Sequence, residues 1–108
     1  MNDTPKLALP LPMEALAEFC RKWNIIKLSV FGSILREDFR PDSDVDFLVV
    51  FAPGTCYGMF KSMEMESELQ QILNRPVDLA EEESIQRSEN WIRREEILST
   101  AECLYRAA

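Results

Sequence analysis

The sequence predicts an α/β fold in the broad sense, and within it the α+β class: a small mixed β-sheet with helices packed on it. Two apolar, partly β-branched segments, residues 25–31 and 45–51, have the composition of strands and are bounded by turn signals. The second is apolar on both faces from Phe47 to Phe51, as in a central strand that helices cover. Segments with apolar residues at helical spacing lie before the first strand and after the second. Together these observations indicate one sheet layered with helices.

The first part of the chain is expected to be an arm followed by a helix. Residues 1–10 contain Pro5 and Pro10 and are expected to form a loose N-terminal arm. Pro12 suits the first turn of a helix, and the apolar residues behind it recur at helical spacing as far as Trp23. Because a chain of 108 residues has the length of one domain, we expect residues 11–108 to form a single domain.

The second half of the chain is expected to alternate between helices and strands. Pro53 and Gly54 mark a turn, and the helix predicted over residues 59–74 is stopped by Pro76. Residues 77–80 are predicted to form a short third strand. The acidic residues 81–83 are expected to begin another helix, because negative charge is favourable at a helix N-terminus. The helical pattern continues past residue 90, and residues 103–105 are expected to form a last short strand.

The composition excludes several classes of function. With 19 acidic and 12 basic residues the net charge is −7, which argues against direct nucleic-acid binding, because that affinity comes mostly from Lys and Arg on phosphates. The absence of histidine excludes Ser-His-Asp and Cys-His catalysis, so any general base is a carboxylate, or a metal does the activating. No apolar run approaches the roughly 18 residues of a membrane span, and the N-terminus lacks the pattern of a signal peptide. We therefore expect a cytoplasmic protein without membrane contact.

Two further sets of residues receive structural interpretations. Cys20, Cys56 and Cys103 are odd in number and lack Cys-x-x-Cys spacing, so the sequence predicts no zinc site. They are expected to be small buried hydrophobic residues in a reducing compartment. The arginines near the C-terminus are expected to form a solvated basic face, or else a patch that meets a partner protein. These are Arg87, Arg93 and Arg94.

The most informative motif is Gly32-Ser33, followed after ten residues by Asp44-Val45-Asp46. In an extended strand, side chains at positions i and i+2 point the same way, so the two carboxylates are expected to project together. Two unit charges about 4 Å apart repel by roughly 4 kcal/mol at an effective dielectric constant of 20. A divalent cation would relieve that repulsion, and Mg²⁺ prefers one or two carboxylates together with substrate phosphates.

The segment after the first strand is predicted to bind an anion. Gly32 allows a tight turn and the close approach of a ligand. Ser33 is expected to open a short helical segment that runs to Asp38, and a helix N-terminus offers free N–H groups and positive dipole potential. A phosphate site and a metal site would then lie at the ends of two successive strands.

These residues resemble the signature of the minimal nucleotidyltransferases, small members of the DNA polymerase β-type nucleotidyltransferase superfamily. The resemblance runs from about Trp23 to the end of the chain, and one departure from the family pattern is Glu37, where the family often has Gly. It also implies a third carboxylate after a helix and a short turn, for which Asp78 is the candidate. The residues that carry the resemblance are Phe31-Gly32-Ser33, Arg36, Asp38, Pro41 and Ser43-Asp44-Val45-Asp46.

The resemblance implies transfer of AMP from ATP to a hydroxyl group. Asp44 and Asp46 would hold two Mg²⁺ ions, and Asp78 would bind one of them and help to deprotonate the acceptor. Ser33 and the backbone after Gly32 would hold the β- and γ-phosphates. Two assignments stay open at this point. Arg36 either lies near the phosphates or pairs with a neighbouring acid in solvent, and Ser43 either caps a turn or reaches a phosphate oxygen.

The resemblance also implies a protein partner. Larger nucleotidyltransferases carry an extra domain that binds the acceptor, and a chain of 108 residues is expected to have no room for one. Minimal nucleotidyltransferases are typically encoded beside a HEPN-domain toxin and act as antitoxins by adding AMP to one of its tyrosines. We therefore expect a HEPN-domain toxin as the partner, in a hetero-oligomer. The alternative is a non-catalytic antitoxin that neutralises its partner by binding alone.

Overall fold

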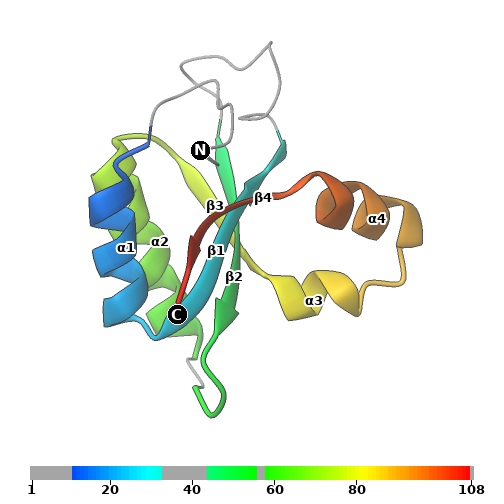
Figure 1. Cartoon of the computed structure of the whole chain (residues 1–108), viewed down its shortest axis with the longest axis horizontal. Coiled ribbons are helices and arrows are strands. Elements are labelled where there is room, and N and C mark those ends of the chain that lie inside the picture. The colour runs from blue at the N-terminus through cyan, green and yellow to red at the C-terminus, as the bar shows by residue number, and fades with distance from the viewer. Residues whose placement is uncertain (1–10, 33–43, 56–57, 108) are drawn as a thin grey trace.

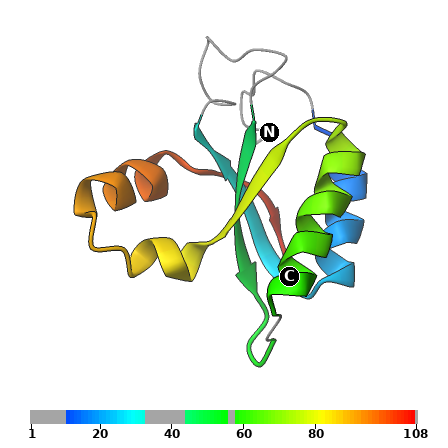
Figure 2. The ribbon, with the colours of Figure 1, turned by 180° about the vertical axis from the view of Figure 1, so that it is seen from behind.

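The computed structural model describes residues 11–32, 44–55 and 58–107. Their helices and strands follow each other as the sequence predicts, and Figures 1 and 2 show them from opposite sides. The elements are α1 (Met13–Lys22), β1 (Ile25–Phe31), β2 (Val45–Phe51), α2 (Met59–Leu73), β3 (Val77–Glu81), α3 (Glu82–Gln86), α4 (Trp91–Thr100) and β4 (Glu102–Arg106).

The four strands form one mixed sheet in the order β3-β2-β1-β4. Strand β1 runs antiparallel to both β2 and β4, whereas β2 and β3 are parallel. The mixed sheet predicted from the sequence is therefore confirmed. Strand β2 lies inside the sheet, as its apolar sequence predicts.

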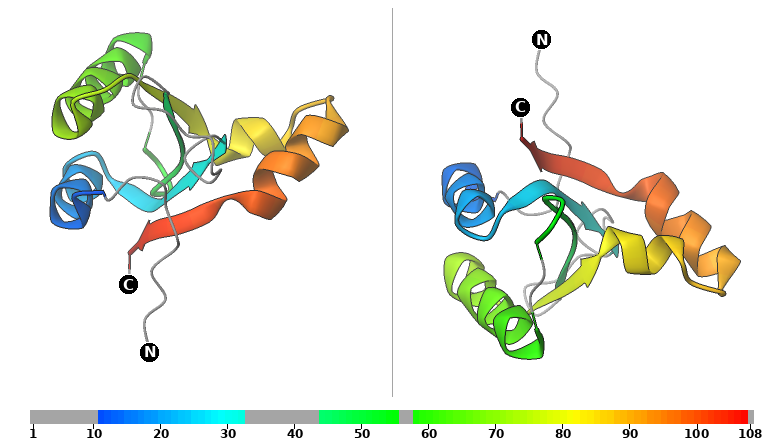
Figure 3. Two further views of the ribbon diagram at one scale, coloured as in Figure 1. Left: turned by 90° about the horizontal axis from the view of Figure 1, so that it is seen from above. Right: turned by 90° about the horizontal axis from the view of Figure 1, so that it is seen from below.

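Helices cover both faces of the sheet. Helices α1 and α2 lie side by side on one face, and α3 and α4 lie on the opposite side (Figure 3). The larger hydrophobic core fills the space between the sheet and the α1–α2 layer and contains Val45, Phe47 and Val49 of β2. A smaller cluster on the α3–α4 side joins Leu48 of β2 to Phe31 and Ile97. Because side chains alternate along a strand, Asp46 lies on the face of Leu48 and hence on the α3–α4 side.

Local sequence signals explain where several elements end. Helix α2 ends at Leu73 and is capped by Asn74, which adopts the left-handed conformation with φ 57°, a conformation that Asn tolerates well. Helix α4 begins after Asn90, whose side-chain oxygen accepts a hydrogen bond from the backbone N–H of Arg93 at 3.2 Å. Trp23, at the end of the helical pattern of α1, is buried, and so is Cys20.

Three expectations from the sequence differ from the structure or fall outside it. Cys103 is exposed, so the prediction that it is buried is wrong. It lies on β4, the last strand on one side of the sheet, where no other strand of the described residues pairs with its outer flank. The motif predicts that Asp44 and Asp46 lie together on one extended strand; β2 begins at Val45, so Asp44 precedes the strand and is exposed. The predicted helical segment from Ser33 to Asp38 lies outside the described residues. Within the part of the chain that the structure describes, no helix is long and apolar enough to cross a membrane.

Candidate functional site

Asp46 and Asp78 occupy the same register position on the parallel strands β2 and β3. Side chains at one register position of adjacent strands project from the same face of the sheet. A backbone hydrogen bond from the N–H of Val45 to the carbonyl oxygen of Pro76, 3.1 Å long, joins the two strands where both begin. The sheet therefore brings together two carboxylates that are far apart in the sequence, and it does so at the end where the motif after β1 also lies.

Gly32 faces the carboxylate of Asp46. Phe31, the last residue of β1, pairs with Asp46 across the antiparallel ladder, and Gly32 follows it directly. Gly32 has φ +79°, and a Cβ atom there would lie 2.5 Å from Oδ2 of Asp46. Both the backbone conformation and the contact require glycine. The Gly-Ser turn and the Asp-x-Asp segment of the motif thus meet at this point.

The Asp46 carboxyl is held in an unfavourable environment for a charge. The pKa of Asp46 is raised from 3.8 to about 6, chiefly by burial and in addition by the negative charges of Asp78 and Asp44, while the positive charge of Arg93 opposes the rise. Burial disfavours the charged form of a carboxyl, and so do nearby like charges. The three predicted carboxylates therefore interact electrostatically, with Asp46 half-buried between the exposed Asp44 on its own chain segment and Asp78 on the next strand.

Arg93 is a site residue that the sequence interpretation missed. Ile97 packs against Phe31 and Leu48, and this contact holds α4 against the face of the sheet that carries Asp46. Arg93 precedes Ile97 by four residues, so both belong to one stripe of the helix. The spacing of Arg93 and Ile97 is visible in the sequence, but the docking of α4 on this face is not.

The other two arginines of the predicted basic face are engaged elsewhere. Arg87 forms an ion pair with Glu83 within one turn, at 3.3 Å. Arg94 donates a hydrogen bond to the backbone oxygen of Ser88 at 3.2 Å. Of the three arginines, Arg93 is the one that acts on Asp46.

Three predicted phosphate-binding residues, Ser33, Arg36 and Ser43, lie outside the described residues. The described site therefore consists of Gly32 and the three aspartates. Among the described residues, no group of three or more acidic or cysteine side chains gathers closely enough to form a complete metal site. The donor set nevertheless suits Mg²⁺, which takes oxygen ligands and usually needs one or two carboxylates because substrate phosphates supply the rest.

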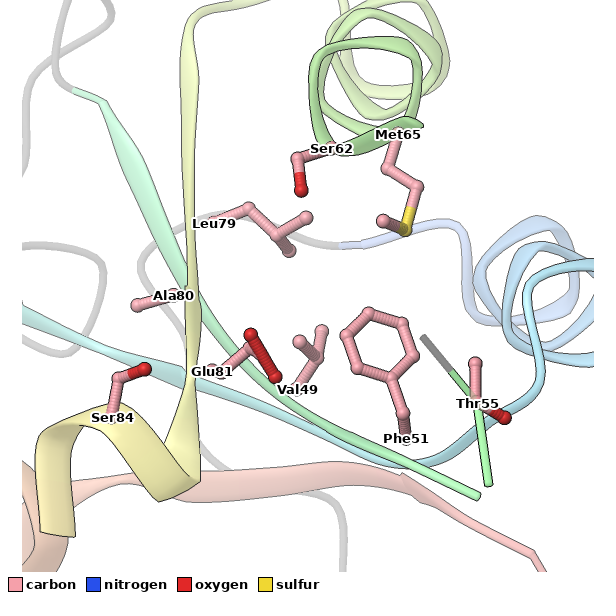
Figure 4. Close-up of a pocket in the computed structure, with 9 residues that line it drawn as sticks. All are labelled: Val49, Phe51, Thr55, Ser62, Met65, Leu79, Ala80, Glu81 and Ser84. Atoms are coloured by element: carbon pink, nitrogen blue, oxygen red, sulfur yellow. The ribbon is translucent and has the colours of Figure 1, made fainter. Parts of the chain in front are cut away.

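A separate cavity of about 370 Å³ lies toward the other ends of β2 and β3, under α2. Figure 4 shows that apolar side chains such as Phe51, Leu79 and Met65 point into it, with Glu81 and Ser84 at one side. Of the predicted site residues that the structure describes, none lines this cavity. The carboxylate site is instead at the opposite end of these strands, next to the point where β1 ends and β2 and β3 begin.

Comparison with known sequences agrees with this geometry. The sequence profile of the family described as "Nucleotidyltransferase domain" matches residues 12–102. A relative named protein adenylyltransferase MntA, from Thermococcus cleftensis, is 34% identical over 68 residues, which make up 63% of this chain and 67% of that protein. A solved structure provisionally named a minimal nucleotidyltransferase is 29% identical and has a TM-score of 0.63, covering 83% of this chain and 86% of that one.

Two solved complexes share the fold at lower identity. A toxin–antitoxin structure with AMP-PNP has a TM-score of 0.69 and 17% identity, over 90% of this chain and 75% of that chain. A complex of a tri-AMPylated HEPN toxin from Shewanella oneidensis with its MNT antitoxin has a TM-score of 0.60 and 18% identity, over 88% of this chain and 70% of that chain. Since the family profile spans most of the chain, the protein belongs to the nucleotidyltransferase domain family and is an enzyme of the minimal nucleotidyltransferase type.

Proposed function

We propose that this nucleotidyltransferase moves AMP from ATP to a tyrosine hydroxyl of a HEPN-domain toxin, and that it acts in this way as the antitoxin of that protein. The observation that carries the proposal is the pairing of Asp46 with Asp78 at one register position, directly beside Gly32. The names of the relatives support the chemistry and the partner, because they include a protein adenylyltransferase and a complex of an AMPylated HEPN toxin with an MNT antitoxin.

Mg²⁺ fits the charges of this site. Asp46 is partly buried next to two other carboxylates, and this concentration of negative charge favours a bound cation. We assign Asp44, Asp46 and Asp78 as the protein ligands of two Mg²⁺ ions, with phosphate oxygens completing the coordination. When bound, the ions would supply charge neutralisation at the phosphate that is attacked and at the oxygen that leaves.

The chain's own residues have distinct roles in the proposed transfer. The acceptor oxygen forms a bond to the α-phosphorus of ATP, the bond from that phosphorus to the bridging oxygen breaks, and pyrophosphate leaves. We assign Asp78 to accept the proton of the hydroxyl, because the chain contains no histidine for this task. Gly32 lets the backbone come close to Asp46 and to the phosphates. Ser33, Arg36 and Ser43 are proposed to bind phosphate oxygens.

Mass measurement on a co-expressed pair tests this function. The chain is expressed with the product of the neighbouring gene, the proposed HEPN-domain partner, and the intact masses of both are determined for wild type, Asp46→Asn and Glu89→Gln. We expect one or more AMP increments on the HEPN protein with wild type and with Glu89→Gln, which removes the same charge at an exposed position of the chain. With Asp46→Asn the increments should disappear.

A growth assay in the same cells separates the enzyme from a non-catalytic antitoxin. If transfer is the mechanism, Asp44→Asn should still bind the HEPN protein but should fail to protect cells from it. Full protection by Asp44→Asn at matched expression, without AMP on the partner, would establish that binding alone neutralises the toxin. AMP increments that persist in Asp46→Asn would contradict the site assignment itself.

A further inference from the structure

The packing of α4 places a positively charged side chain on the carboxylate side of the sheet. Ile97 is 6% exposed and is buried with Phe31 and Leu48, and Leu48 is the next residue of β2 after Asp46 on the same face. Figure 1 shows α4 nearer than α3 to the end of β1 where the site lies. One turn before Ile97, Arg93 extends the same stripe of the helix beyond the hydrophobic contact.

Two observations fix the start of α4 and leave the guanidinium of Arg93 available. The backbone N–H of Arg93 donates to the side chain of Asn90 at 3.2 Å, which caps the helix. Arg87 is held by an ion pair and Arg94 by a hydrogen bond, whereas the Arg93 side chain forms no such contact within the described part of the chain. The Arg93 side chain is exposed. Its charge nonetheless reaches Asp46, whose pKa it lowers.

We propose that Arg93 binds the phosphates of the nucleoside triphosphate and positions them beside Asp46 and Asp78. This inference rests on the proposed transfer function. A guanidinium is planar and permanently charged, and its paired donors match phosphate oxygens. In a chain with net charge −7, a triphosphate approaching three aspartates meets like charge, and Arg93 supplies the opposite charge from the helix that faces them.

A purely structural role for Arg93 predicts different behaviour. If the guanidinium only offset the charge of the aspartates, its removal would alter the stability of the free protein and leave nucleotide affinity almost unchanged. If it binds phosphate, its removal weakens the binding of ATP while the free protein stays folded. Arg87 offers a matched control, because Arg87→Gln removes the same charge from an exposed position where the arginine pairs with Glu83.

Titration calorimetry on the full chain provides the test, with a non-hydrolysable ATP analogue and Mg²⁺ as the probe. We expect Arg93→Gln to weaken binding of the analogue about tenfold or more, as for loss of a charge-assisted hydrogen-bonded pair. Arg87→Gln should stay within about twofold of wild type. Arg93→Lys keeps the charge but loses the paired donors, so it should recover only part of the affinity. Melting curves without nucleotide confirm that each variant is folded.

The remaining outcomes overturn the inference in distinguishable ways. If Arg93→Gln and Arg87→Gln both bind the analogue as wild type does, Arg93 does not contact the nucleotide. If Arg93→Gln binds normally but transfers AMP slowly, with kcat reduced and KM for ATP unchanged, the guanidinium serves the acceptor instead. If wild type itself binds no analogue, the proposed function fails, and the assignment of Arg93 fails with it.

Discussion

The carboxylate of Asp46 lies so close to the backbone of Gly32 that residue 32 has no room for a side chain. A Cβ atom at residue 32 would lie 2.5 Å from Oδ2 of Asp46. The antiparallel pairing of Phe31 with Asp46 creates this approach, since Gly32 follows Phe31 at the end of β1. The glycine of the motif therefore determines where the central carboxylate of the site can lie.

We expect Gly32→Ala to destabilise the protein and to abolish transfer. The substitution adds a Cβ at φ +79° and pushes it against Asp46. The matched control is Gly54→Ala, which adds a Cβ at φ +83° with no atom within 4 Å. The backbone strain common to both should cost roughly 1–2 kcal/mol, so the difference between the two free energies of unfolding isolates the contact with Asp46.

Denaturant unfolding and the transfer assay together check this prediction. Gly54→Ala should keep wild-type transfer, because residue 54 lies in the turn after β2, outside the carboxylate site. Equal losses of stability and full activity in both variants would show that the approach of Gly32 to Asp46 is not needed.

The raised pKa of Asp46 predicts an unusual pH dependence for the metal-free protein. The pKa of Asp46 is about 6 in the folded chain, whereas its ordinary value is 3.8. Between pH 3.8 and about pH 6, the folded state therefore binds more protons than the unfolded state. The contribution of Asp46 to stability is therefore present at low pH and is lost as pH rises through about 6. In EDTA, Asp46→Asn should be more stable than wild type at pH 7.5, by about 1 kcal/mol at most because solvent screens this half-exposed group.

Urea denaturation at pH 4.5 and pH 7.5 measures this difference, and the gain from Asp46→Asn should shrink at the lower pH. Glu89→Gln, an exposed change of acid to amide, serves as the reference. A gain that is the same at both pH values would mean that Asp46 titrates normally.

Helix α4 is expected to depend on Ile97 for its position. Ile97→Ala removes a side chain that is 6% exposed and packed with Phe31 and Leu48, and such a truncation costs about 2–4 kcal/mol. Ile92→Ala is the matched control in the same helix, because Ile92 is 63% exposed and its loss should cost less than about 0.5 kcal/mol. Denaturant unfolding checks the difference, and a similar cost for both would contradict the docking of α4 on this face.

Much of the fold could be predicted because its signals are local. The strands Ile25–Phe31 and Val45–Phe51 were predicted with the bounds that the structure has, since apolar runs are bounded by clear turn signals. The order of the helices and the last strand followed from periodicity and from the stop signal at Pro76. Cys103 shows the limit of composition: whether a small apolar residue is buried depends on which strand forms the edge, and that is set by pairing across the sheet.

The site was predictable only in part, because it is assembled from distant segments. Asp46 carries a local signal in the Asp-x-Asp spacing, whereas the place of Asp78 came from the resemblance and its register with Asp46 from the structure. Arg93 had no signal of its own. Its position depends on which face of the sheet α4 covers, and that face is chosen by a contact between Ile97 and residues far away in the sequence, Phe31 and Leu48.

The final prediction concerns the metal and the nucleotide together. ATP with Mg²⁺ should raise the melting temperature on the order of 10 °C, because a ligand that binds only the folded state at a hundredfold excess over its Kd stabilises by about 2.7 kcal/mol. ATP with excess EDTA should give a far smaller shift, since the triphosphate would then meet Asp44, Asp46 and Asp78 without a cation between them. Asp46→Asn should lose most of the Mg²⁺-dependent part, and Glu89→Gln should keep it. Thermal melts of the three proteins with and without EDTA measure these shifts. An equal shift in Mg²⁺ and in EDTA would rule out metal-dependent binding at the aspartates.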